Sequence, residues 1–142
     1  MRLAINACYG GFGLSPKALR RFAELRGRNC FFFQNHPPGQ IGLLDLHRYW
    51  PISDTEAEQA VFWSAFDVPD PNGLTDWGTH ALYARDIARD DPILLQVIDE
   101  LGEEADGRCA KLKVVEIPDG VAWAIEEYDG NEWVSEEHRT WS

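Results

Sequence analysis

A glycine-rich loop between a predicted strand and a predicted helix is the segment with the clearest chemical meaning. Three glycines within four residues suit neither a helix nor a strand, and Ser followed by Pro is a typical helix start. Glycine allows a ligand to approach the backbone, and exposed N–H groups beside a helix dipole favour an anion such as phosphate. We therefore expect a phosphate-binding site here, with a tight structural turn as the alternative. Its expected ligand-binding residues are Tyr9, Gly10, Gly11, Phe12, Gly13 and Ser15.

Two arginines form a second candidate site. If residues 83–91 are helical, the spacing of Arg85 and Arg89 places both guanidinium groups on one face. Two such groups can clamp a phosphate or a carboxylate through bidentate hydrogen bonds. The alternative is pairing with the neighbouring carboxylates of Asp86, Asp90 and Asp91 on a solvated face.

The C-terminal segment forms a third candidate site. His138, Arg139 and Trp141 combine an imidazole, a cation and an aromatic ring, which could complete a pocket or reach a partner subunit. The alternative is a frayed tail. Because disordered tails are normally low in aromatic residues, Trp141 favours packing on a folded surface, either within the domain or across a homo-oligomer.

No spacing singles out a catalytic or metal-binding group. Cys8, Cys30 and Cys109 lie far apart without a CxxC pair, so we expect no zinc site. Cys8 and Cys30 lie in apolar runs and are expected to be small buried side chains. The glycine loop is neither a Walker loop nor a GxGxxG fingerprint. We therefore expect no catalytic residue, metal or cofactor, although enzymatic activity stays open.

The composition indicates a soluble, acidic, globular protein. The chain has 142 residues, 44% of them hydrophobic, and a formal net charge of −11. Such a charge favours solubility and repels nucleic acid and anionic membranes. No signal peptide and no apolar run of membrane-spanning length is evident, so we expect a cytoplasmic protein. Six tryptophans and seven phenylalanines are more than a core of this size needs, which suggests that some serve a pocket or an interface.

The pattern of the chain predicts a mixed α+β fold. We expect two or three helices packed on a small mixed sheet with an antiparallel C-terminal hairpin, in one domain over residues 1–142. A variable, loop-rich section is expected at residues 34–80. The predicted helices cover residues 16–25, 54–66 and 92–101. The predicted strands cover residues 3–8, 29–33, 111–117 and 121–128, with the last two as the hairpin.

Three stretches resemble a family of small, largely uncharacterised phage and prophage proteins. They are the opening INACYGGFGLS, the stretch RDIARDDPILLQVIDELGEEADG and the ending KLKVVEIPDG…EEYDG…EEHRTW. The resemblance covers both ends of the chain and leaves out roughly residues 30 to 80. It implies a phage setting rather than an activity, and no catalytic residue is carried over from it. Small phage proteins often counter host defence, and one class sequesters nucleotide signals.

The expected function is therefore that of a binding protein. It would capture a phosphorylated small molecule, with a nucleotide immune signal as the favoured ligand, and hold it without turnover. A second hypothesis is an acidic interaction protein that inhibits a host DNA-binding or defence protein, because 13 acidic residues face 4 Lys and Arg from Pro92 onward. A third is a nucleotide hydrolase. The expected partners are the small ligand and further copies of the chain, with no nucleic acid and no membrane.

Overall fold

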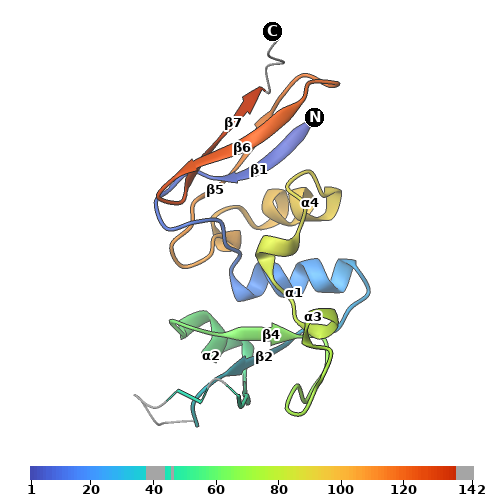
Figure 1. Ribbon diagram of the computed structural model, residues 1–142, viewed down its shortest axis with the longest axis vertical. Coiled ribbons are helices and arrows are strands. Elements are labelled where there is room, and N and C mark those ends of the chain that lie inside the picture. The colour runs from blue at the N-terminus through green and yellow to red at the C-terminus, as the bar shows by residue number, and fades with distance from the viewer. Residues whose placement is uncertain (38–43, 46, 137–142) are drawn as a thin grey trace, which may run out of the picture.

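The computed structural model places two helices between two β layers (Figure 1). It describes residues 1–37, 44–45 and 47–136. One layer contains β1 (Arg2–Asn6) paired with β5 (Leu112–Glu116), and the hairpin of β6 (Trp123–Tyr128) and β7 (Asn131–Glu136). The other contains β2 (Phe31–Gln34) between β3 (Trp50–Ile52) and β4 (Ser64–Phe66). All strand pairs within these sheets are antiparallel.

The two main helices are α1 (Pro16–Leu25) and α4 (Pro92–Leu101), with the bounds that the sequence predicts. Each begins with a capping side chain followed by proline. The Ser15 hydroxyl accepts a hydrogen bond from the amide of Ala18, and the Asp91 carboxylate accepts from two first-turn amides of α4. The remaining helical elements are short: α2 (Asp54–Gln59), α3 (Trp77–His80) and the 3₁₀ turns Ala84–Asp86 and Gly102–Ala105.

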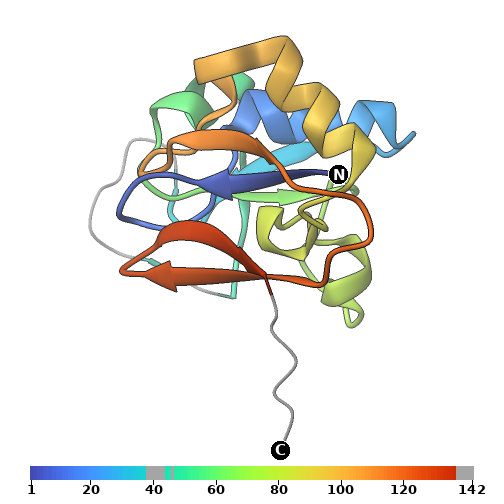
Figure 2. The ribbon, with the colours of Figure 1, turned by 90° about the horizontal axis from the view of Figure 1, so that it is seen from above.

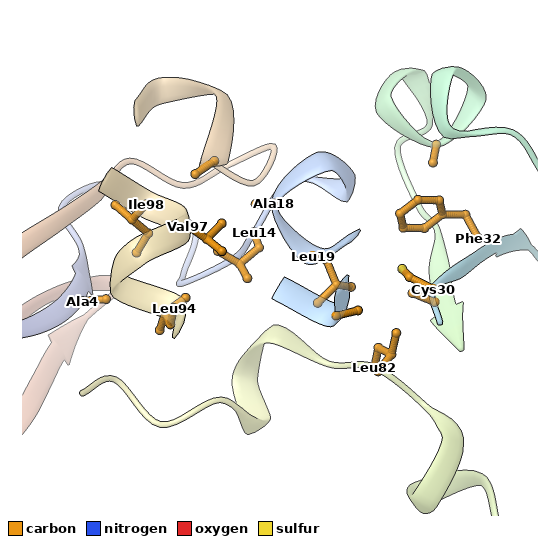
Figure 3. Close-up of a cluster of buried hydrophobic side chains, with 14 of the residues drawn as sticks. Ala4, Leu14, Ala18, Leu19, Cys30, Phe32, Leu82, Leu94, Val97 and Ile98 are labelled. Atoms are coloured by element: carbon orange, nitrogen blue, oxygen red, sulfur yellow. The ribbon is translucent and has the colours of Figure 1, made fainter. Parts of the chain in front are cut away.

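The main core runs through α1 (Figure 3). Ala18 and Leu19 lie between the α4 side chains on one side and the β2 region on the other. The buried α4 residues Leu94 and Val97 have no exposed surface. One continuous apolar cluster therefore joins residues from both halves of the sequence.

A second, smaller core consists largely of aromatic rings. Phe33, Tyr49, Phe66 and Trp77 meet edge to face, with ring centroids 5.0–6.3 Å apart. This arrangement suits the quadrupoles of aromatic rings. Part of the surplus of aromatic residues is thus used inside the fold, next to the sheet of β2, β3 and β4.

The fold class agrees with the prediction, and a C-terminal antiparallel hairpin is present, but its strands differ from those predicted. Residues 112–116 pair with β1, with Ala4 opposite Val114. The hairpin forms one strand later, around Asp129 and Gly130, whose φ values are +51° and +87°. Two consecutive residues with positive φ match the right-handed twist of a two-residue hairpin turn. The Pro-Asp-Gly sequence at residues 118–120 lies in the connection between β5 and β6, which belong to separate sheets.

The middle section also differs from the prediction. The helix expected over residues 54–66 ends at Gln59, and residues 64–66 form β4 instead. The apolar residues that suggested a longer helical face divide between two surroundings: Ala65 is buried in the sheet, whereas Val61 is exposed. Sheet pairing with β2 therefore overrides the weak helical period.

Candidate functional site

The glycine loop lies where three segments meet closely. The Gly10 amide donates to the carbonyl of Asp129, at 3.1 Å, and the Gly107 amide donates to the carbonyl of Gly13, at 3.0 Å. A Cβ on Gly130 would overlap the amide nitrogen of Gly11 and lie 2.7 Å from that of Gly10. The lack of a side chain at Gly130 thus permits the loop to pack under the hairpin turn, and the positive φ values of Gly10 and Gly11 give these two residues a structural reason as well.

The N-terminus of α1, beside this loop, already carries an anionic group. The amide of Lys17 donates to the Glu58 carboxylate on α2, at 2.8 Å. The next amide donates to the Ser15 hydroxyl, at 3.1 Å. The protein's own carboxylate therefore occupies the position that the sequence suggests for a phosphate.

Arg89 lies against the glycine loop, but its guanidinium is engaged within the protein. It forms two parallel hydrogen bonds with Glu132, Nη1 to Oε1 at 2.6 Å and Nη2 to Oε2 at 2.9 Å. Its guanidinium also stacks on the ring of Phe12, 3.7 Å from the centroid. The side chains of Arg89 and Glu132 are only 19% and 6% exposed.

Asn6 extends this contact into a network. Its backbone amide donates to the Glu132 carboxylate at 2.8 Å, and its side-chain amide donates to the Gly130 carbonyl at 2.8 Å. The amide of Lys111 donates to its side-chain oxygen, also at 2.8 Å. The end of β1, the hairpin and the segment before β5 are therefore joined by one buried asparagine and one buried ion pair.

Arg85 lies on a different element from Arg89. Residues 83–91 do not form the helix that would align them, because only Ala84–Asp86 make a 3₁₀ turn. Arg85 instead stacks on the ring of Tyr83, 4.6 Å from its centroid. Arg85 and Arg89 therefore do not share a helical face. Arg85 lies instead beside Tyr83, and Tyr83 lines a groove.

This groove, here called the α1 groove, runs between α1 and residues 78–91 and has a volume of about 550 Å³. Its apolar floor comes from α1 and from the chain around Leu82, and its polar lining includes Arg26, Arg28, Tyr83 and Asp86. These residues come from two segments that are well separated in sequence, and no local spacing marks them. The only hint of the groove in the sequence is the presence of basic residues at the end of α1 and of an aromatic residue in the later segment.

The arginines of the α1 groove keep free hydrogen-bond donors. Arg26 pairs with Asp91 through Nη2 and stacks on Phe22, 5.3 Å from the ring centroid. Arg28 donates from Nε and Nη2 to Asp67, at 3.2 and 2.8 Å, and from Nη2 to the carbonyl of Thr79, at 3.1 Å. A guanidinium has five N–H donors, so both side chains retain N–H groups that have no partner in the described part of the chain.

Asp67 anchors Arg28 and is itself held in its charged form. Partial burial opposes ionisation, but hydrogen bonds from Arg28 and His80 outweigh it and keep the pKa of the Asp67 carboxyl below its usual value. His80 Nδ1 lies 2.8 Å from Asp67 Oδ1. The Asp67 carboxylate thus holds the Arg28 guanidinium in position at the groove.

The cysteines differ in exposure. Cys30 is buried, as predicted, and burial raises the pKa of its thiol to about 11. Cys8 was expected to be buried but is exposed, because β1 ends at Asn6 and the chain turns into the glycine loop. Cys109 is also exposed. Among the residues that the structure describes, no group of three or more His, Cys, Asp or Glu side chains could hold a metal ion.

Three expected site residues, His138, Arg139 and Trp141, lie outside the described residues. Within the described ranges, no helix has the length and apolar character needed to cross a membrane. Comparisons of the chain with models of protein families, with curated proteins and with solved structures find no match.

Proposed function

We propose that the protein captures a small phosphorylated molecule, with a nucleotide as the favoured class, and holds it without turnover in the α1 groove. The observation that carries the proposal is the combination of free guanidinium donors and aromatic rings in one groove of about 550 Å³. Pockets of a few hundred cubic ångströms accommodate ligands of this size. Arginine binds phosphate oxygens in a fixed fork, and a base can stack on an exposed aromatic ring.

The acidic residues of the α1 groove are compatible with this ligand. Asp91 is satisfied by the amides of Ile93 and Leu94 and by Arg26. Asp86 has no hydrogen-bonding partner for its carboxylate among the described residues, so it can accept from a ribose hydroxyl or a base amino group. Among the described residues, the lining includes no His, Cys, Ser or Lys, and its unpartnered carboxylate, that of Asp86, is assigned here to ligand binding.

The glycine loop is the competing place for the same ligand. Its residues, together with Arg89, form the site expected from the sequence. We favour the α1 groove because the first-turn amides of α1 and the Arg89 guanidinium already have partners within the protein. Arg85 belongs to the favoured site through its stacking on Tyr83.

The resemblance to phage proteins extends the proposal to a setting. There the ligand would be a nucleotide immune signal, and the protein would act as an anti-defence sponge in the cytoplasm of the host cell. The same proposal includes a homo-oligomer whose copies contact one another through the C-terminal segment that contains His138, Arg139 and Trp141. Nucleic acid and membranes are disfavoured as partners by the net charge of −11.

The deciding experiment is mass spectrometry of small molecules released by heating the purified protein. We expect a phosphorylated compound of unchanged mass after prolonged incubation, and a changed mass would favour the hydrolase alternative. Titration calorimetry with the released compound then tests the site. The proposal would be refuted if no compound is released and no nucleotide binds from a panel of mono-, di- and cyclic nucleotides.

Matched variants locate the site. Tyr83→Ala should weaken binding by about 1–3 kcal/mol, the range for loss of a stacked base. Arg85→Ala should also weaken binding, whereas Arg48→Ala should not, since Arg48 stacks on Trp50 away from the α1 groove at a similar 4.9 Å. If Gly11→Val removes binding without lowering the melting temperature, the loop and not the groove is the site.

A further inference from the structure

The β6–β7 hairpin presents one face to the body of the protein and the other face outward. Cross-strand partners share a face, and successive residues alternate between faces. Glu132 is buried and points inward, so its neighbour Trp133 and the partner of Trp133, Glu126, point outward. Tyr128 lies on this outward face as well, opposite Asn131. Figure 2 shows the hairpin at the margin of the molecule, with β7 nearer to β1.

Two aromatic side chains of this outward face are well exposed. Tyr128 is 71% exposed and Trp133 is 45% exposed. They occupy diagonal positions on the two strands, a separation of about 7–8 Å at the backbone, which aromatic side chains can bridge. Tyrosine and tryptophan are enriched where proteins bind one another. The face therefore has the composition of a contact surface.

A carboxylate is held at the edge of the tryptophan ring. The indole Nε1 of Trp133 donates to the Glu126 carboxylate, at 3.0 Å. This hydrogen bond fixes the ring and places a negative charge at its edge. An ammonium or guanidinium group that lies over the ring gains from the π-system and from the adjacent carboxylate together.

The charge of the segment selects the kind of partner. From Val114 to Glu136 there are seven acidic residues and no Lys, Arg or His. A second copy of this hairpin, a nucleic acid or an anionic membrane would be repelled. A basic protein segment would be attracted, and its side chains fit both features of the face.

We propose that the outer face of the hairpin, formed by Glu126, Tyr128 and Trp133, docks a segment of a partner protein that is rich in lysine and arginine. The partner's cations stack on the two rings, and their charge is balanced by Glu126 and by the acidic residues around the turn. This surface is separate from the α1 groove, so the two proposals can fail independently.

The test is a titration of the ¹⁵N-labelled protein with a ten-residue peptide of alternating Arg, Lys and Gly, followed by nuclear magnetic resonance. We expect amide shift changes concentrated in residues 123–136, and no binding of the same peptide with Glu in place of Arg and Lys. Tyr128→Ala and Trp133→Ala should each lower the affinity by about 2–5-fold, because an exposed cation–π contact contributes about 0.5–1 kcal/mol. Neither substitution changes the net charge.

Phe62→Ala is the matched control, since Phe62 is 79% exposed on the connection between α2 and β4. It should leave the affinity unchanged. Glu126→Gln provides a second test that keeps both rings, and it should also weaken binding. Shift changes scattered over acidic residues of the whole surface, or aromatic variants that bind like the unsubstituted protein, would overturn the proposal. Light scattering that shows hairpin-dependent dimers would overturn it as well.

Discussion

Arg89 and Glu132 form a bidentate ion pair that joins the segment before α4 to the C-terminal hairpin, with hydrogen bonds of 2.6 and 2.9 Å. The carboxylate also accepts the amide of Asn6, so three segments depend on one buried charge. Arg89 was expected to bind a ligand, and it lies beside the glycine loop, against the ring of Phe12. Its hydrogen bonds, however, give it a structural role in the described fold.

Removal of one partner from this pair should be strongly destabilising. In Arg89→Met, the Glu132 carboxylate stays buried without its counter-charge, and we expect a loss of about 3–5 kcal/mol in the free energy of unfolding. The double variant Arg89→Met with Glu132→Gln keeps an acceptor for the Asn6 amide and removes the unpaired charge. It should recover a substantial part of the loss. Urea unfolding measures both, and equal stability of the single and double variants would contradict the buried-charge account.

Close packing at Gly130 predicts a difference between two glycines with similar backbone angles. Gly130 and Gly120 have φ values of +87° and +76°, so alanine is strained at both. Only at Gly130 would the new Cβ meet the amides of the glycine loop, and Gly120 faces open space. We expect Gly120→Ala to cost about 1 kcal/mol and Gly130→Ala to cost about 1–3 kcal/mol more. Similar melting temperatures for the two variants would show that the glycine loop can move away from the new Cβ at little energetic cost.

Loss of Glu58 should create an anion site that the unsubstituted protein lacks. In Glu58→Ala, the Lys17 amide at the start of α1 loses its carboxylate partner. Inorganic phosphate could then bind there, and by mass action it should raise the melting temperature of this variant more than that of the unsubstituted protein. Gln59→Ala, on the exposed face of the same short helix, is the control at equal ionic strength. An equal phosphate effect in all three proteins would mean that this helix end is closed to ligands.

The lowered pKa of Asp67 predicts an acid-dependent loss of stability. A carboxyl whose folded-state pKa lies below its unfolded value of about 4 stabilises the fold above that pH, and the contribution disappears as the pH falls through the folded-state pKa. Asp67→Asn should therefore be less stable than the unsubstituted protein at pH 7 and should lose less stability between pH 5 and pH 3. Urea unfolding across this range provides the measurement, with the exposed Asp90→Asn as control. Parallel curves for Asp67→Asn and the unsubstituted protein would contradict the assignment.

The three thiols should react in two classes. Cys8 and Cys109 are exposed, whereas Cys30 is buried and the pKa of its thiol is raised to about 11. Alkylation at pH 8 should modify the first two within minutes and Cys30 only after unfolding, because the thiolate is the reactive form. Peptide mass mapping after timed quenching distinguishes the sites. Fast modification of Cys30 in the folded protein would show that its surroundings open.

The two main helices, α1 and α4, were predictable because their signals are local. The caps Ser15 and Asp91, each followed by proline, and the apolar periods of the two main helices lie within single stretches of sequence. The partner of a strand depends on distant residues, and so β5 was assigned to the wrong neighbour. The short strands β3 and β4 were missed because three-residue strands carry too little pattern to separate them from loops or helices.

The candidate site shows the same division. The glycine loop was recognisable as a loop, but its close contacts with Gly107 and Gly130 depend on the tertiary fold. The α1 groove combines Arg26 and Arg28 with Tyr83, and only the packing of α1 against residues 78–91 brings them together. A lone tyrosine or arginine is uninformative in sequence until its neighbours in space are known.

The pairing of β1 with β5 has a consequence for synthesis on the ribosome. Leu3, Ala4 and Ile5 leave the exit tunnel more than 100 residues before their ladder partners on β5, and they are nearly fully buried in the finished fold. Those ladder partners are Lys113 to Val115. Until β5 emerges, β1 therefore exposes an apolar strand without its partner, which is the condition in which nascent chains recruit chaperones or aggregate. Pauses in translation while residues 112–116 are still inside the tunnel should accordingly be harmful, whereas pauses after these residues have emerged should be tolerated.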